Sequence, residues 1–253
     1  MDPALLLKPV HRRRLREVWR SAGWPYQDLI EAELLAAGLL ARERDAAGRD
    51  TVRVSDTGVA AIAQTLRDNR AARSAHEALV EAVARELQRH GRLVWRGLSL
   101  RAPLASVCEQ EGEEAGTRWV MAVPDVFSIR QTTREDRLEP SVHEIKVRRA
   151  DLLADLKRPD KRAAYLALAG ECWYVLAPGV GDADDVPAPH GVLRAAAGGL
   201  ELLRPAERRV QRPGFMLWMA LARAAPDPVQ DDEQSRLGGP PRADAGSPHE
   251  PEP

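Results

Sequence analysis

The chain has 253 residues, and its 37 basic and 38 acidic residues leave a net charge of -1. This near-balance excludes a protein that is basic throughout and binds nucleic acid by overall charge. Two cysteines, Cys108 and Cys172, have neither CxxC nor Cys/His spacing, so no disulfide framework or zinc site is indicated. No segment approaches the ~20 apolar residues of a membrane span, and we expect a cytoplasmic protein without a membrane partner.

Residues 1–72 are expected to form a small α+β module. The helical spacing of Leu15 and Val18 predicts a first helix over residues 10–22, and "PYQDLIEAELLAAG" predicts a second. A strand, a charged turn over residues 45–50, a returning strand and another helix should follow. This order resembles a winged helix-turn-helix module, with "GLLARERDAAGRDTVRVSDTG" as the wing.

The helix that would enter the major groove in such a module carries Asp28, Glu31 and Glu33 and no Lys or Arg. Acidic side chains have the wrong sign for approaching phosphates. A transcription regulator led by this module is therefore an alternative and not the leading interpretation.

Residues 73–224 are expected to form a second domain with the element order α-β-β-β-α-β. The first helix spans residues 74–90, and three strands are predicted in "RLVWRGLSL", "RWVMAVPDVFSI" and "SVHEIKV". A helix in "ADLLADLKRPDKRAAYLALAG" and a strand in "CWYVLAP" follow, and a hairpin with one more apolar helix closes the domain. The predicted fold class is α/β.

Residues 225–253 form a tail rich in Pro, Gly and acidic residues, for which we expect disorder. The tail holds seven acidic residues and two arginines, a balance of -5, so the preceding 224 residues carry +4. The body of the protein is therefore mildly basic, and the acidic tail hides this in the average.

Three charged residues, Asp125, Glu144 and Lys146, interrupt segments that otherwise have the composition of a sheet interior. Because side chains alternate along a strand, Glu144 and Lys146 share one face, and His143 and Ile145 point to the other. A long hairpin connection would bring Asp125, at the end of the preceding strand, beside them. Two carboxylates next to a lysine favour a divalent cation, Mg²⁺ or Mn²⁺, held by Asp125, Glu144 and the backbone carbonyl of Ile145.

These residues carry a resemblance to a known family. "PD" at residues 124–125, followed by "EIK" at residues 144–146 in an α-β-β-β-α-β order, resembles the PD-(D/E)xK nuclease superfamily. The resemblance implies a restriction-endonuclease-like core that cleaves DNA with a divalent metal, Asp125 and Glu144 as ligands and Lys146 as the catalytic lysine. "EIKVRRADLLADLKRPDKRAAY" is similar to the MmcB DNA-repair branch, which implies a nucleoid-associated repair role.

Many members of the superfamily use a further carboxylate from the first helix. Glu77 is our preferred candidate for this position, because it lies at the edge of the apolar stripe, and Glu81 should be turned further toward solvent. A solvated helix edge is the alternative for both residues.

Charged residues crowd the 15-residue span from 148 to 162. A phosphate clamp beside the scissile bond is expected from the six basic ones: Arg148, Arg149, Lys157, Arg158, Lys161 and Arg162. Asp151 should cap the helix that follows. Asp155 and Asp160 either support the metal ligands from behind or pair with basic neighbours.

The leading interpretation is a metal-dependent DNA nuclease in repair, whose front module orients it on DNA or on a partner. A DNA-binding protein that has the nuclease fold but does not cleave is the first alternative. DNA is the expected partner, and a repair protein and a second copy of the chain stay open as others. Aromatic residues are only 4% of the chain, which argues against a platform for stacking single-stranded bases.

Overall fold

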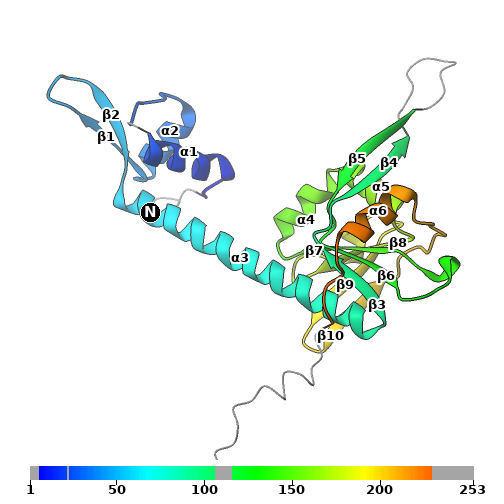
Figure 1. Ribbon diagram of the computed structural model, residues 1–253. Helices are drawn as coiled ribbons and strands as arrows, with labels where there is room; N and C mark the ends of the chain where they lie inside the picture. Colours follow the sequence, from blue (N-terminus) through cyan, green and yellow to red (C-terminus); the bar gives the residue numbers. More distant parts are fainter. Residues whose placement is uncertain (1–5, 22, 106–115, 230–253) are drawn as a thin grey trace, which may run out of the picture. The chain divides into compact units, whose positions relative to one another are not determined.

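The computed structural model describes residues 6–21, 23–105 and 116–229; Cys108 and most of the predicted tail lie outside them. The chain divides into two compact units, one up to Ala75 and one from His76 onward, where the sequence placed a boundary between residues 72 and 73. Helices and a mixed sheet make the fold α/β (Figure 1). Among the described helices, none is long and apolar enough to cross a bilayer.

The N-terminal unit combines helices with a two-stranded antiparallel hairpin, as its sequence predicts. Its core is formed by residues such as Leu15, Leu34 and Val52, each at most 1% exposed. In chain order its elements are α1 (Pro9–Arg20), α2 (Leu29–Ala36), β1 (Leu40–Arg44), β2 (Asp50–Val54) and the first half of α3 (Asp56–Arg89).

The acidic residues of α2 are used inside the N-terminal unit. Asp28 caps the helix by accepting from the backbone N–H of Glu31, at 2.9 Å. Glu31 is buried and its carboxylate lies 3.0 Å from a guanidinium nitrogen of Arg42. The Glu33 carboxylate lies 2.6 Å from Nε2 of His11. These acids therefore stabilise the module, and α2 presents no basic surface.

Helix α3 is continuous over 34 residues, and the break that the sequence analysis placed near residues 71–75 is wrong. The segment "RDNRAARSAHE" contains neither Gly nor Pro, so nothing interrupts the helical hydrogen bonds there. The boundary between the two units lies inside this helix.

The C-terminal unit is built on a six-stranded sheet with the order β10-β9-β8-β7-β6-β3. Strands β7, β8 and β9 are parallel, and the remaining neighbours are antiparallel. The strands are β3 (Arg92–Arg96), β6 (Val126–Arg130), β7 (Ser141–Lys146), β8 (Glu171–Leu176), β9 (Gly191–Ala196) and β10 (Gly199–Arg204). The antiparallel pairing of β6 with β7 confirms the predicted hairpin with a long connection.

Two of the predicted long strands are each broken in two. The outer parts, β4 (Leu100–Ala105) after the first break and β5 (Thr117–Ala122) before the second, pair as a separate ribbon. One break is at Gly97, whose φ of +59° suits glycine, and the other is at Val123–Asp125, where Pro124 lacks the N–H of a strand residue. Asp125 therefore stands at the corner before β6, and not at the end of a strand as predicted.

The long helix predicted after the EIK motif is also two helices, α4 (Arg149–Leu156) and α5 (Pro159–Leu168). Pro159 cannot donate a backbone hydrogen bond to the preceding turn, so α4 ends shortly before it and α5 starts at this residue. The expected cap by Asp151 is wrong, because the N-cap position is Arg148 and Asp151 lies within the first turn. The final hairpin and the apolar helix α6 (Phe215–Arg223) are confirmed.

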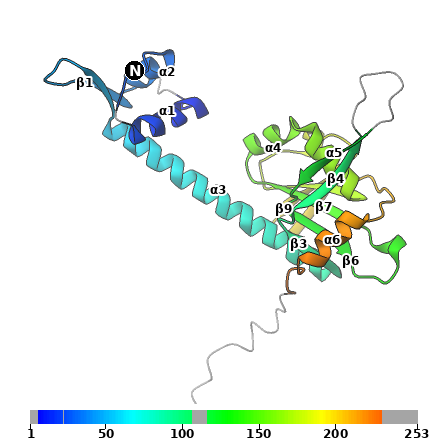
Figure 2. The same cartoon turned by 45° about the horizontal axis from the view of Figure 1, so that its top comes forward.

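The sheet has helices on both faces, as Figures 1 and 2 show. Ile145 of β7 packs with Val80 and Val83 of α3 on one face. Val142 of the same strand packs with Ala164 of α5 on the other. Even-numbered positions of β7 therefore face α5, and these include Glu144 and Lys146.

Candidate functional site

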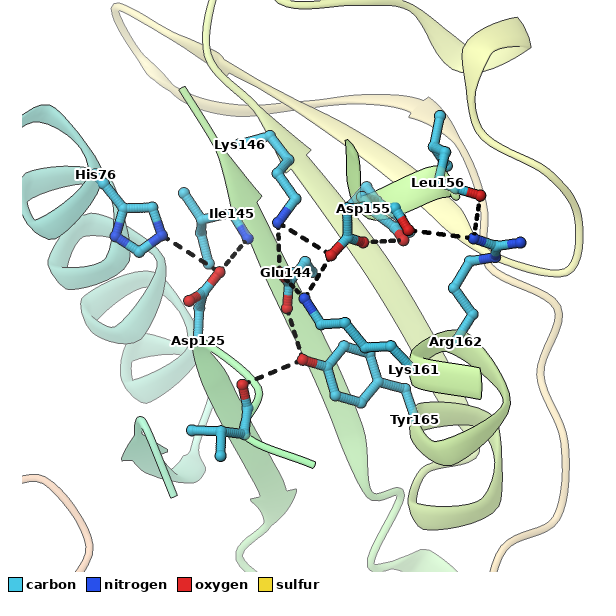
Figure 3. A network of polar contacts seen from close by, with 12 residues as sticks. His76, Asp125, Glu144, Ile145, Lys146, Asp155, Leu156, Lys161, Arg162 and Tyr165 are labelled. Carbon is cyan, nitrogen blue, oxygen red and sulfur yellow. Dashed lines mark hydrogen bonds and ion pairs between the residues drawn. The ribbon is translucent and has the colours of Figure 1, made fainter. Parts of the chain in front are cut away.

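Glu144 lies at the centre of a buried polar cluster between β7, β8, α4 and α5 (Figure 3). Nζ of Lys146 contacts Oε1 of Glu144, as the alternation of β7 predicts. Nζ of Lys161, from α5, lies 2.5 Å from the same oxygen. The Tyr165 hydroxyl lies 2.8 Å from Oε2. Both oxygens of this carboxylate thus accept hydrogen bonds from the protein.

Asp155 of α4 completes the cluster. Its Oδ1 lies 2.5 Å from Nζ of Lys161 and 3.6 Å from Nζ of Lys146. Its Oδ2 accepts a hydrogen bond of 2.7 Å from the hydroxyl of Tyr174. We call Glu144, Lys146, Asp155 and Lys161 the Glu144 cluster. Two carboxylates and two ammonium groups give it a formal charge of zero.

The protonation of the cluster follows from these contacts. Burial alone would raise the pKa of Asp155, but hydrogen bonds from Lys161 and Tyr174 hold that pKa below its ordinary value. Burial would lower the pKa of Lys161, and the charge of Glu144 raises it instead. Burial and then Glu144 raise the pKa of Tyr165 far above neutrality. The carboxylate of Asp155, the ammonium of Lys161 and the neutral hydroxyl of Tyr165 are therefore the forms present near pH 7.

Asp125 lies immediately before the start of β6, next to Ile145, the residue that follows Glu144. Its Oδ2 accepts a 2.7 Å hydrogen bond from the backbone N–H of Ile145 and lies 3.4 Å from Nε2 of His76. Burial, and then the charge of Glu144, raise the pKa of Asp125. Because N–H and C=O of one strand residue point to the same side, the Ile145 carbonyl faces the side on which Asp125 lies. Asp125 is thus bonded to β7 at the residue that directly follows Glu144.

Glu77 and Asp125 line the same open pocket of about 450 Å³, together with His76 and Arg96. Glu77 is exposed, whereas Glu81, one turn later, is half-buried. The expected order of exposure was therefore wrong, but Glu77 is the one of the two that shares a pocket with Asp125.

The expected phosphate clamp is not one surface. Lys161 points into the Glu144 cluster and its side chain is only 19% exposed. Arg162 donates to the carbonyl of Leu156 at the end of α4, at 2.7 Å. Arg149 is paired with Asp185 through Nη2 and Oδ1, at 2.7 Å.

Of the other predicted clamp residues, Arg148 is half-buried, and Lys157 and Arg158 are exposed between α4 and α5. The break at Pro159 distributes these basic residues over α4, α5 and the connection between them. Asp160 lies at the surface, 3.0 Å from a guanidinium nitrogen of Arg118. Of the two roles considered for this residue, it therefore has the one of pairing with a basic neighbour. Of the three acids named beside the motif, only Asp155 contacts the predicted site.

Three functional candidates were missed: His76, Tyr165 and Tyr174. Tyr165 follows Lys161 by four residues, so the two lie on one face of α5. Tyr174 is in register with Glu144 on the neighbouring strand. Both signals are present in the sequence, but each has meaning only after the strands and helices are paired correctly.

The oxygen donors that could hold a cation here are Asp125, Glu144 and the Ile145 carbonyl. Among the described residues there is no group of three or more His, Cys, Asp and Glu arranged to hold a metal ion. Mg²⁺ commonly takes only one or two carboxylates from a protein and keeps several waters. Asp125 and Glu144 would supply two carboxylates, and Ile145 a carbonyl. A cation at Glu144 would share that carboxylate with Lys146 and Lys161.

No family model matches this sequence, and no curated protein matches it. Among solved structures, it is similar to the SPO1766 protein of unknown function from Silicibacter pomeroyi. The two chains are 23% identical, the likeness covers 56% of this chain and 77% of that one, and the TM-score is 0.37.

Proposed function

We propose that the C-terminal unit is a metal-dependent nuclease of the PD-(D/E)xK type that hydrolyses phosphodiester bonds of DNA, in DNA repair. One observation carries the proposal: Asp125 is bonded to the N–H of Ile145, so its carboxylate lies beside the Glu144–Lys146 pair at the end of β7. The proximity of Glu144 contributes to the raised pKa of Asp125, which is the electrostatic condition that a bound cation relieves. The order α3, β3, β6, β7, α4–α5, β8 supports the same family, with the β4–β5 ribbon as an insertion.

Each residue of the motif has a role in this proposal. Asp125, Glu144 and the carbonyl of Ile145 would hold Mg²⁺ or Mn²⁺, which when bound makes a water more acidic and offsets charge on the phosphate. The Lys146 ammonium is held in place by Glu144 and adds positive charge where the phosphate becomes more negative. Lys157 and Arg158 are the exposed basic residues for the flanking phosphates.

A second candidate is a DNA-binding protein of the same fold that does not cleave. It is favoured by the ion pair between Lys161 and Glu144, because this second ammonium neutralises charge that a cation would otherwise offset. The two candidates agree on DNA as the partner and differ in whether Glu144 is available to a metal.

The experiment that separates them is incubation of the purified full chain with nicked, branched, single-stranded and mismatched DNA, with Mg²⁺ or Mn²⁺ and with EDTA. We expect cleavage that requires the metal and that falls about 100- to 1000-fold in Asp125→Asn and in Lys146→Met. Asp160→Asn is the matched control, because its carboxylate is exposed and pairs only with Arg118 among the described residues.

Binding without cleavage of any substrate would overturn the nuclease proposal and support the second candidate. Lys161→Met sharpens the test, because it removes the competing ammonium and should increase the affinity of Glu144 for Mn²⁺. Titration of the two proteins with Mn²⁺ gives that affinity directly, without a cleavage assay.

A further inference from the structure

Helix α1 of the N-terminal unit presents a row of residues apart from its buried face. Arg12, Arg16, Trp19 and Arg20 follow one another at i, i+4, i+7 and i+8, so they lie along one side of the helix. We call these four residues the α1 stripe. His11, Leu15 and Val18 form the buried face of the same helix.

The arginines of the α1 stripe have no acidic partner among the described residues. Their neighbours in the same unit do: Arg13 lies 2.8 Å from Glu17. In the hairpin, Arg49 lies 2.8 Å from Asp45. The stripe is thus a local excess of positive charge on α1. An anionic partner is the complement of such a row.

An exposed aromatic ring lies within this row of charge. The side chain of Trp19 is 60% exposed, and Trp24, just beyond the end of α1, is 65% exposed. Beside Trp19 is an open depression of about 340 Å³, which is also lined by Gly23, Val52 and Arg53. An exposed tryptophan ring beside a depression offers a flat apolar surface on which another ring can stack.

We infer that the α1 stripe and the depression beside Trp19 bind single-stranded nucleic acid. The arginines contact successive phosphates, and the Trp19 ring stacks on a base that enters the depression. A strand of nucleotides alternates anions with flat apolar rings, and the stripe places a ring between cations. This surface differs from α2, the helix expected to contact DNA, and it requires no cleavage by the C-terminal unit.

The test is fluorescence anisotropy of a labelled oligonucleotide titrated with the full chain in EDTA, so that binding is measured without cleavage. The ligands are single-stranded DNA, single-stranded RNA of the same sequence, the DNA duplex and poly-glutamate. Stronger binding of either single strand than of the duplex and poly-glutamate is expected. The two single-stranded arms tell which sugar is preferred.

The variants separate the two kinds of contact. The triple variant R12Q/R16Q/R20Q should weaken binding at least about ten-fold and make the dependence of log Kd on log salt shallower by about 2, since each lost phosphate contact contributes about 0.7. W19L should weaken binding about 5- to 150-fold with the salt dependence unchanged, and W19F should restore part of the loss.

The matched control is R13Q/R44Q/R49Q, which removes the same number of positive charges from arginines that are paired with acids. It should change the affinity less than about three-fold. Equal losses in the stripe and control variants, or an unchanged affinity in W19L, would overturn the inference. Tighter binding of the duplex or of poly-glutamate would also overturn it, in favour of a duplex or of an acidic protein partner. Circular dichroism of each variant verifies that the helices are retained.

Discussion

The Glu144 cluster and the α1 stripe are both charged, and they satisfy their charges in opposite ways. In the cluster, side chains of Glu144 and Asp155 that are 5% exposed are compensated by lysines of the same unit. In the stripe, arginines on an accessible helix have no acid beside them among the described residues. A charged side chain that is buried must be paired inside the protein. A charged side chain in water is solvated and stays available to a binding partner. The cluster is therefore suited to chemistry at one point, and the stripe to binding along a chain.

The largest effect is expected from breaking the buried compensation. Glu144→Leu leaves Lys146 and Lys161 with only one carboxylate, so the free energy of unfolding of the C-terminal unit should fall by about 3–5 kcal/mol. Hydrogen exchange at the β7 amides measures this unit separately. Glu17→Leu, which removes a solvated acid paired with Arg13 and Arg14, is the control and should cost far less than Glu144→Leu. A loss below about 1 kcal/mol in Glu144→Leu would mean that the cluster is solvated and not a buried network.

An intermediate effect on the free energy of unfolding is expected from Asp155 and Asp125. Removing the charge should lower the stability at one position and raise it at the other. The pKa of Asp155 in the folded protein lies below its ordinary value of about 3.9, so its contribution to stability is present above pH ~4 and is lost as the pH falls through the folded pKa. Asp155→Asn should therefore lose about 1–3 kcal/mol at pH 7, and the difference should disappear in acid. Urea denaturation from pH 3 to pH 8 measures it.

Asp125 should behave in the opposite way in the metal-free protein, because its folded pKa is raised by burial and by Glu144. The ionised form is disfavoured in the folded state, so the wild-type chain loses stability as the pH rises through that pKa. Asp125→Asn in EDTA should be more stable than wild type at pH 7, with a gain that shrinks toward pH 4. The same sign for both variants would refute the electrostatic description of the site.

The smallest effect on stability is expected at the α1 stripe. Each of the substitutions Arg12→Gln, Arg16→Gln and Arg20→Gln should change the free energy of unfolding by less than about 0.5 kcal/mol, because no ion pair with a described residue is lost. Thermal denaturation of the single variants measures this. A loss above about 1.5 kcal/mol at any one position would show that its guanidinium supports the fold, and the contrast with the Glu144 cluster would then fail there.

Local patterns in the sequence predicted a large part of the fold and a smaller part of the site. Helix α1, both hairpins and α6 were predicted from periodicity and turn residues, and so was the shared face of Glu144 and Lys146. The strand breaks at Gly97 and Pro124 were missed, because a long apolar segment has the same composition whether it stays in one sheet or passes into another. The continuity of α3 was missed, although residues 67–77 contain neither Gly nor Pro.

The sequence by itself determined which residues share a face, since alternation along a strand and spacing along a helix are properties of the backbone. Only the tertiary structure decided that Lys161 turns inward to Glu144 and Asp155, while Lys157 and Arg158 stay exposed. The same residue type is a phosphate contact on a surface and a counter-ion in a core, and the difference is its distance from water and from acids that lie elsewhere in the chain. Those distances are set by how α4 and α5 pack on the sheet, which no local pattern contains.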